Sequence, residues 1–232
     1  QFVMILDSTV MNVSISNVAK DLGTTISGMQ AAITLYALTM AAFMLTGGKI
    51  GDKWGRRKAF VIGSVVYGIG SFITALSPNL SVLLFRWSLI EGLGAILVIP
   101  AIAALAAINY SGKDRVIAFS ILGAATGMAA AIGPLIGGLV TSYFTWRYVF
   151  LAETIIMIIV LLVASKISDR KADKNTVIDI PSSILSAGGM AMLVFGVLQS
   201  KTWGWVTPLA SPTINGKEIE PFGISLVAYL IL

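Results

Sequence analysis

The stretch GGKIGDKWGRRK, residues 47–58, separates two long apolar runs of the chain. Gly48, Gly51 and Gly55 recur at intervals of three and four, a spacing that lets helix backbones approach closely. Asp52 is placed to accept hydrogen bonds from the start of a following helix. If the turn is helical, Arg56 lies four residues on, within reach of Asp52. The stretch therefore predicts a tight, charged turn between two helices.

The composition favours a membrane protein. The 232 residues are 56% hydrophobic and 12% charged, with a mean hydropathy of +0.89, whereas soluble domains carry about twice that charged fraction. The chain has no cysteine and no histidine, which excludes disulfides, thiolate metal sites and histidine chemistry from it. We expect no metal and no cofactor other than protons. The net charge of +5 is distributed as expected for membrane topology, so we expect no nucleic-acid partner.

Apolar runs of about 20 residues predict membrane-spanning helices. Alternation of the kind found in strands is absent over these lengths. Six runs are long enough to be complete spans: 29–50, 59–77, 82–108, 116–142, 149–166 and 181–200. Two more, 2–19 and 222–232, lie at the ends of the sequence, and we expect them to be parts of spans cut from a longer protein.

The basic residues predict the orientation of these spans. Most of them lie in alternate loops, namely Lys49, Lys53, Arg56, Arg57, Lys58, Lys113, Arg115, Lys166, Arg170, Lys171 and Lys174. The opposite loops hold only Lys20, Arg147, Lys201 and Lys217. Since cytoplasmic loops carry an excess of lysine and arginine, the first set should face the cytoplasm.

The turn at 47–58 closely resembles the signature loop between the second and third helices of the major facilitator superfamily, roughly G-x-L-a-D-r-x-G-r-k. The matching residues are Gly48, Ile50, Gly51, Asp52, Lys53, Gly55, Arg56 and Arg57. In that family the loop is a cytoplasmic latch between the two halves of the transporter, which biases one state of alternating access. The resemblance implies the same role here, although an ordinary basic cytoplasmic loop would also contain these charges.

Further stretches resemble the branch of fourteen-span drug:proton antiporters. LDSTVMNVSIS, from Leu6, is similar to the first-helix motif L-D-x-T-x-x-N-V-A-L-P, and WRYVFLAE, from Trp146, to W-R-W-x-F-x-x-N. IDIPSSILSAGGMAMLVFGVL resembles the seventh helix of that branch. The resemblance implies an all-α integral membrane protein with a six-helix N-terminal bundle over 1–166, a cytoplasmic loop over 167–180, and linking helices seven and eight over 181–232, the eighth truncated.

GPLIGG, residues 133–138, resembles the fifth-helix antiporter motif of the same branch. Small or kinking residues lie in one row along this span, at Gly123, Gly127, Ala131, Pro134 and Gly138, and Gly133 and Gly137 belong to the motif itself. Such a row lets a neighbouring helix approach at backbone distance, and Pro134 removes one helical hydrogen bond. We expect an interface on which helices rock, with ordinary small-residue packing as the alternative.

Four ionisable residues lie inside the predicted spans: Asp7, Arg86, Glu91 and Glu153. Charges within a membrane are costly and usually mark ion or substrate pathways. Asp7 and Glu91 are expected near the midplane, and Asn12 belongs to a second polar face of the first helix, with Ser8 and Ser16. Alternatively, Asp7 is a structural carboxylate, and Glu91 forms a static bridge with Arg86.

The fourth-helix motif of the family, R-x-x-Q-G-x-G-A, aligns on EGLGA at 91–95. Its glutamine position holds Glu91, its arginine position holds Ser88, and Arg86 is displaced by two residues. Similarly, Glu153 stands where the family has asparagine. We therefore expect Glu91 and Glu153 to couple protons or attract a cationic substrate. Burial disfavours the charged form of a carboxyl group, which suits a group that loads and releases protons.

Together these features predict a secondary active exporter in the cell membrane that exchanges inward protons for outward amphipathic or cationic compounds. The alternative keeps the fold and exports a lipid, siderophore or metabolite. The chain lacks the G-x-S-x-G elbow and the phosphate-binding lysine loop, so we expect no enzyme. Its partners would be the small-molecule substrate, the lipid bilayer and the C-terminal half of the same protein.

Overall fold

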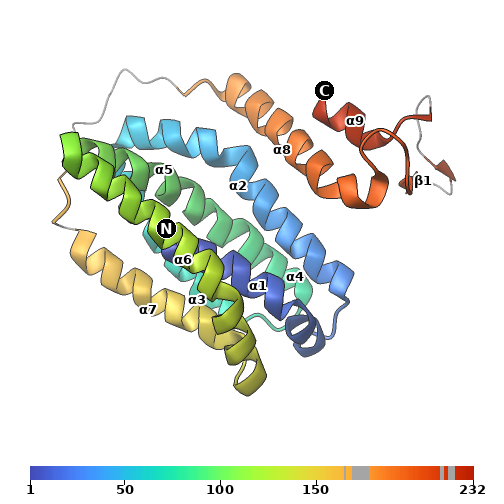
Figure 1. Ribbon diagram of the computed structural model, residues 1–232, viewed down its shortest axis with the longest axis horizontal. Coiled ribbons are helices and arrows are strands. Elements are labelled where there is room, and N and C mark those ends of the chain that lie inside the picture. The colour runs from blue at the N-terminus through green and yellow to red at the C-terminus, as the bar shows by residue number, and fades with distance from the viewer. Residues whose placement is uncertain (165, 169–177, 215–216, 219–222) are drawn as a thin grey trace. The chain divides into compact units, whose positions relative to one another are not determined.

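The computed structural model describes residues 1–164, 166–168, 178–214, 217–218 and 223–232. The chain divides into two compact units, residues 1–178 and 179–232. The first unit contains α1 (Phe2–Asp21), α2 (Ile26–Trp54), α3 (Arg56–Ala75), α4 (Leu80–Leu83), the π-helix η1 (Leu84–Glu91), α5 (Gly92–Asn109), α6 (Gly112–Tyr143) and α7 (Arg147–Ala164) (Figure 1).

The predicted spans are confirmed within the described residues, where seven helices are long and apolar enough to cross a membrane. The run 82–108 is one such span, formed by α4, η1 and α5 together, Leu80–Asn109. The run 2–19, expected as a partial span, forms a 20-residue helix that reaches span length. The loop 167–180, with Arg170, Lys171 and Lys174, lies mostly outside the described residues.

Local signals in the sequence explain where two of these helices begin. The Thr25 side chain accepts a hydrogen bond from the Gly28 amide at 3.0 Å, and Asn79 accepts one from the Val82 amide at 3.0 Å. Both are N-caps, which satisfy amides that have no partner in the first turn. Gly55 separates α2 from α3 with φ of 96°, a left-handed conformation that glycine adopts without steric cost.

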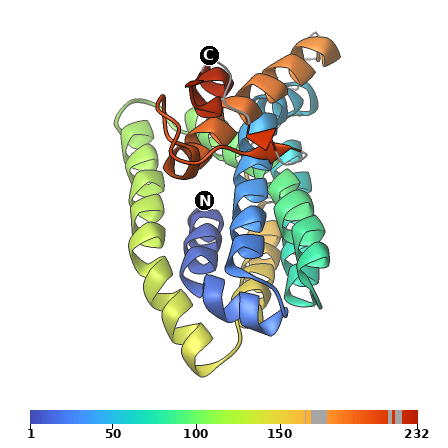
Figure 2. The same ribbon diagram turned by 90° about the vertical axis from the view of Figure 1, so that its right-hand side faces the viewer.

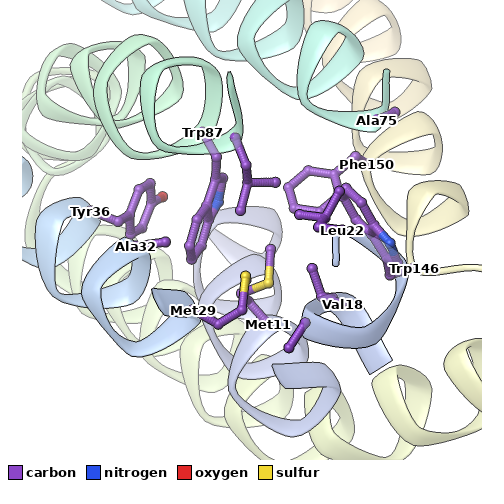
Figure 3. Packing of buried hydrophobic residues seen from close by; sticks show 12 residues of the cluster. Met11, Val18, Leu22, Met29, Ala32, Tyr36, Ala75, Trp87, Trp146 and Phe150 are labelled. Atoms are coloured by element: carbon purple, nitrogen blue, oxygen red, sulfur yellow. The ribbon is translucent and has the colours of Figure 1, made fainter. Parts of the chain in front are cut away.

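Helix α1 lies between α6 and α2 in the first unit (Figure 2). Helix α3 packs against α5, α7 and η1, and α2 packs against α5. Three buried apolar clusters fill the spaces between these helices, and the largest contains Met11, Tyr36, Trp87, Trp146 and Phe150 (Figure 3). Side chains from α1, α2, η1 and α7 therefore meet at one place inside the bundle.

Glycines allow the helices to cross at backbone distance. A Cβ on Gly94 of α5 would lie 2.5 Å from the Tyr67 amide nitrogen of α3, and one on Gly70 of α3 would lie 2.9 Å from the Glu91 Cα. Gly47 of α2 has the same role against the Ile96 carbonyl of α5. Contacts this close hold membrane helices together without a hydrophobic driving force. As a result, η1 is pressed against α3 at Glu91.

The π-helical segment η1 is a departure from the regular helix expected for the fourth span. It contains Arg86, Trp87, Ser88 and Glu91. A π-helix places more residues in each turn than an α-helix; it is rare in proteins and is frequently found at functional sites. Trp87, Ser88 and Glu91 are all fully buried, so the segment turns these three side chains into the bundle while Arg86 stays at its edge.

The second unit contains α8 (Ile180–Trp203), the two-residue strands β1 (Thr213–Ile214) and β2 (Lys217–Glu218), and α9 (Leu226–Ile231). The strands pair antiparallel, with Thr213 opposite Glu218. Helix α8 confirms the predicted span 181–200. The run 222–232, expected as the beginning of an eighth span, forms only the six-residue α9 among its described residues.

Candidate functional site

Three carboxyl groups predicted inside the membrane meet in the centre of the first unit. Asp7 comes from α1, Glu91 from η1 and Glu153 from α7. One oxygen of each lies within 4.8 Å of the other two, and the residues are 1%, 0% and 0% exposed. We call Asp7, Glu91 and Glu153 the acid cluster. The sequence singled out each residue separately and did not predict that they would be neighbours.

Trp87 holds the Asp7 carboxylate. Its indole Nε1 donates to Oδ2 at 2.9 Å and to Oδ1 at 3.1 Å. The indole ring stacks on Tyr36 of α2, with centroids 4.9 Å apart, and meets Phe150 of α7 edge-on. Figure 3 shows Trp87 standing between Tyr36 and the Phe150 side of the cluster. Asp7 is therefore fixed by a neutral donor that contacts three other helices.

The two glutamates of the acid cluster differ in their hydrogen bonds. Ser71 of α3 donates to Glu153 Oε2 at 2.9 Å. Among the described residues neither carboxylate oxygen of Glu91 has a hydrogen-bond partner, and Glu153 Oε1 has none either. The hydroxyls of Tyr67 and Thr74 lie beside Glu91 without completing a hydrogen bond. Glu91 is consequently the least restrained acid of the three.

Arg86 does not neutralise the acid cluster. Its guanidinium donates to the carbonyls of Ile73 and Leu76 at 2.9 and 3.0 Å. Cations suit this position because the last carbonyls of a helix have no partner and carry partial negative charge. The alternative in which Glu91 forms a static bridge with Arg86 is therefore wrong for this structure.

A second arginine, Arg147 at the start of α7, also binds backbone carbonyls at this end of α3. It donates to the carbonyls of Ala75 and Ser77 at 2.7 and 2.8 Å and pairs with Asp21 of α1 at 2.9 Å. Trp146 donates to the same Asp21 oxygen at 2.9 Å. Arg86 and Arg147 are thus both held at this end of α3. No described lysine or arginine forms an ion pair with the acid cluster.

The two polar faces predicted for α1 have different surroundings. Asp7 and Ser14 are buried in the bundle, whereas Asn12 and Ser16 are exposed. The Asn12 amide donates to the carbonyl of Ser8 at 2.7 Å. Asn12 is therefore separate from the acid cluster in this unit.

The turn between α2 and α3 is arranged around Arg56. Its guanidinium pairs with Asp52, as the spacing of four predicted, and donates to the Gly48 carbonyl at 3.0 Å. A Cβ on Gly51 would lie 3.1 Å from the same guanidinium. The expectation that Asp52 caps the following helix is wrong, because Asp52 lies inside the last turn of α2 and α3 has no side-chain cap.

The start of α3 is also tied to α7 through the remaining arginine of the predicted latch. Arg57 Nε donates to the carbonyl of Ala164 at 3.0 Å. The two predicted latch arginines therefore both join helices: Arg56 binds the end of α2, and Arg57 binds, among its contacts, the end of α7.

The small residues of α6 fall on two faces. Gly133 and Gly137 face α1, where a Cβ would meet Thr9 and Val10. At Gly123, Gly127 and Gly138, from the row expected to touch a neighbouring helix, an added Cβ would meet nothing within 4 Å among the described residues. Pro134 lies within α6 and is exposed. The glycines of α6 that approach α1 closely are therefore Gly133 and Gly137, which lie on the face next to the predicted row, and not the glycines of the row itself.

Several buried polar residues of the site were not predicted. They are Tyr36, Tyr67, Ser71, Thr74 and Trp87. A usable signal was present for Trp87, because an indole N–H inside a span needs an acceptor and two acids were already placed at similar depth. The hydroxyl residues gave no comparable signal, since serine and threonine in a span commonly bond to their own helix.

The comparisons with known proteins agree with this architecture. Residues 1–209 match the family model described as Major Facilitator Superfamily. The chain is 32% identical to the puromycin resistance protein of Streptomyces alboniger, over 90% of this chain and 42% of that protein. It is 30% identical to the methylenomycin A resistance protein of Bacillus subtilis, over 88% and 44%. The chain thus spans less than half the length of these relatives.

A third relative is the riboflavin transporter RibZ of Clostridioides difficile, 28% identical over 84% of this chain and 43% of that protein. A crystal structure of a peptide transporter in complex with sulfate matches with a TM-score of 0.63 and 19% identity, over 89% of this chain and 45% of that one, which shows a shared fold. The family match and the seven span-length helices among the described residues indicate a multi-pass membrane protein. The chain belongs to the Major Facilitator Superfamily.

Proposed function

We propose that the full-length protein is a proton-coupled exporter that works by alternating access, moving protons inward and amphipathic or cationic compounds outward. The names of the relatives, which include resistance and export proteins, support outward transport of a small molecule. The observation that carries the proposal is the acid cluster: three carboxyl groups within 4.8 Å of one another, buried in a unit of span-length helices.

The acid cluster is suited to hold protons because its three groups cannot all be charged at low cost. Two like charges at this separation repel by about 3 kcal/mol at an effective dielectric constant of about 20, and no described cation offsets them. Groups coupled this strongly share and exchange protons as a set. Glu91, whose oxygens have no hydrogen-bond partner among the described residues, is the group we assign as the proton carrier.

The driving force for such an exchange is sufficient. One proton that moves inward releases about 2.3 kcal/mol for each 100 mV of membrane potential, and one pH unit adds about 1.4 kcal/mol. Together these correspond to a gradient of several hundredfold for a neutral substrate, since about 1.4 kcal/mol is a factor of ten. A cationic substrate returns part of the electrical contribution.

The proposal also gives roles in alternating access to the α2–α3 turn and to α6. The Asp52–Arg56 pair and the Gly48 contact would form the cytoplasmic latch, and the unfilled row with Gly123, Gly127 and Gly138 would receive the C-terminal half of the protein. In that arrangement the halves rock about α6 while the acid cluster exchanges protons with one side at a time.

The decisive measurement is substrate-stimulated proton flux in proteoliposomes that contain the full-length protein. Glu91→Gln keeps the size of the side chain and removes its acid, so flux should fall by about 10²-fold or more. Unchanged coupling in Glu91→Gln would remove this role from Glu91. Arg86→Gln is the control, because its contacts are with the end of α3.

A metabolite exporter of the same fold is the second candidate, and the riboflavin transporter among the relatives favours it. A transport panel separates the two. Cells that express the full-length protein would be compared for accumulation of lipophilic cations and of flavins, with and without a protonophore. Export of flavins alone would replace the drug-efflux proposal, and insensitivity to the protonophore would contradict proton coupling.

A further inference from the structure

One face of α3 carries a continuous row of buried hydroxyl groups. It consists of Ser64, Tyr67, Ser71 and Thr74, followed by Ser77 just beyond the end of the helix. Successive members are three or four residues apart, which places them on one side of a helix. All five are 0% exposed. We call this set the α3 hydroxyl row.

Most of the α3 hydroxyl row lacks the hydrogen bonds that buried hydroxyls normally make. Ser64, Tyr67, Thr74 and Ser77 have no partner among the described residues. By contrast, Thr39 and Thr154 on neighbouring helices donate to their own backbones at 2.8 and 2.9 Å. Leaving a buried hydroxyl unpaired is unfavourable, so four such groups in one row require an explanation.

The row passes directly along the acid cluster. Ser71 donates to Glu153, Tyr67 lies beside both glutamates, and Thr74 lies beside Glu91. Tyr36 and Trp87 adjoin Asp7 on the far side of the cluster. The unpaired hydroxyls nearest the cluster are thus aimed at groups that can give or take a proton.

At its C-terminal end the row stops at the buried Ser77, next to two arginines that are only partly buried. Arg147 donates to the Ser77 carbonyl and pairs with the half-exposed Asp21, and Arg86 donates to the Leu76 carbonyl. The distribution of basic residues predicts that this end faces away from the cytoplasm. The row therefore joins the enclosed acids to the side from which protons would enter.

We propose that the α3 hydroxyl row conducts protons between the acid cluster and the end of the bundle that carries Asp21 and Arg147. The inference rests on the proposed proton coupling and adds a route to it. A hydroxyl accepts a proton on its oxygen while it releases its own proton to the next group, so neither net charge nor oxidation state changes. Side chains three or four residues apart have Cβ atoms about 5–6 Å apart, a gap that one bridging water spans.

The test uses isosteric substitutions in the full-length protein, reconstituted in proteoliposomes with an entrapped pH-sensitive dye. Thr74→Val removes an unpaired hydroxyl of the row, and Thr39→Val is the matched control, which removes a buried hydroxyl that bonds to its own helix. Thr74→Val should slow substrate-stimulated proton flux by about tenfold or more, and Thr74→Ser should restore it. Thr39→Val should leave the flux unchanged.

The thermal stability of the variants separates a relay from a structural role. Because the Thr74 hydroxyl has no described partner, Thr74→Val should not lower the melting temperature even though the flux falls. If Thr74→Val does destabilise the protein, Ser77→Ala at the end of the row gives the same test outside the helix.

Equal flux in the Thr74→Val, Ser77→Ala and native proteins would overturn the route while leaving proton coupling in place. Absence of substrate-stimulated flux in the native protein would instead contradict the proposed function itself. The two failures are therefore distinguishable in one set of vesicles.

Discussion

The two aspartates of α1 make the same hydrogen bond in opposite surroundings. Asp7 accepts from the Trp87 indole, and Asp21 accepts from the Trp146 indole, each at 2.9 Å. Asp7 is 1% exposed and its charged neighbours are two more acids. The Asp21 side chain is 45% exposed and has Arg147 at 2.9 Å.

The neighbours of each aspartate, and not its hydrogen bond, therefore decide what that aspartate can do. Asp21 pairs with a cation near the surface and accepts from Trp146, and these contacts fasten α1 to the start of α7. Asp7 has no cation near it in the described part of the chain, so a change in its charge must be shared with Glu91 and Glu153. The first is a fixed contact, and the second belongs to the set of acids that we propose exchanges protons.

The largest effect should come from removing each acid in turn. Asp7→Asn keeps an acceptor for the Trp87 indole but removes one of the three neighbouring acids that we propose exchange protons as a set, and we expect coupled flux to fall by about 10²-fold. Asp21→Asn should retain at least half of the native flux. Both are measured in proteoliposomes of the full-length protein. Equal loss in the two variants would remove the distinction between the aspartates.

The protein should tolerate an added methyl group near the acid cluster far less well than one at an exposed position. Gly94→Ala places a Cβ against the backbone of Tyr67, and such overpacking costs about 1–3 kcal/mol. Gly123→Ala meets nothing within 4 Å among the described residues and should change stability by less than about 0.5 kcal/mol. Thermal unfolding in detergent compares the two, and a tolerant Gly94→Ala would show that the crossing of α3 and α5 can relax.

The two tryptophans provide a finer comparison. Trp87→Phe keeps an aromatic ring but removes the donor to Asp7, which takes away a stabiliser of the carboxylate anion. Hydrogen bonds to charged groups contribute about 1.5–3 kcal/mol, so the pH of half-maximal transport should rise by about one to two units. Trp146→Phe should leave that pH unchanged. A common pH profile for both variants would show that Trp87 is merely structural.

The smallest effect is expected from the exposed ion pair itself. Breaking the Asp21–Arg147 pair with Asp21→Asn should lower stability by less than about 1 kcal/mol, because solvent screens exposed pairs. The loss should shrink further in 1 M salt, where the screening length is about 3 Å. Thermal unfolding at low and high salt measures this, and a large loss that does not depend on salt would show that Asp21 acts through its bond to Trp146 instead.

Much of the fold was predictable because the membrane imposes a strong and local requirement. Each span must satisfy its own backbone hydrogen bonds and present apolar side chains to lipid, so runs such as 29–50 and 181–200 could be found without tertiary information. The pairing of Asp52 with Arg56 was also predictable, since it depends on a spacing of four within a helical turn. The π-helix η1 was not, because no local spacing in its sequence distinguishes it from the regular helix expected there, and its contact with Gly70 of α3 joins residues far apart in the chain.

For the candidate site, the sequence was enough to place Asp7, Glu91 and Glu153 as acids inside apolar runs. A charged residue inside a span is unfavourable and therefore conspicuous, and it can be recognised in each span without knowledge of the neighbouring helices. The packing of the helices was needed to establish that the three meet, that Arg86 binds the end of α3 instead of Glu91, and that Trp87 and the α3 hydroxyl row surround them. These contacts join helices far apart in the chain. Their distances depend on how closely glycines such as Gly70 and Gly94 let the backbones approach, which no local spacing specifies.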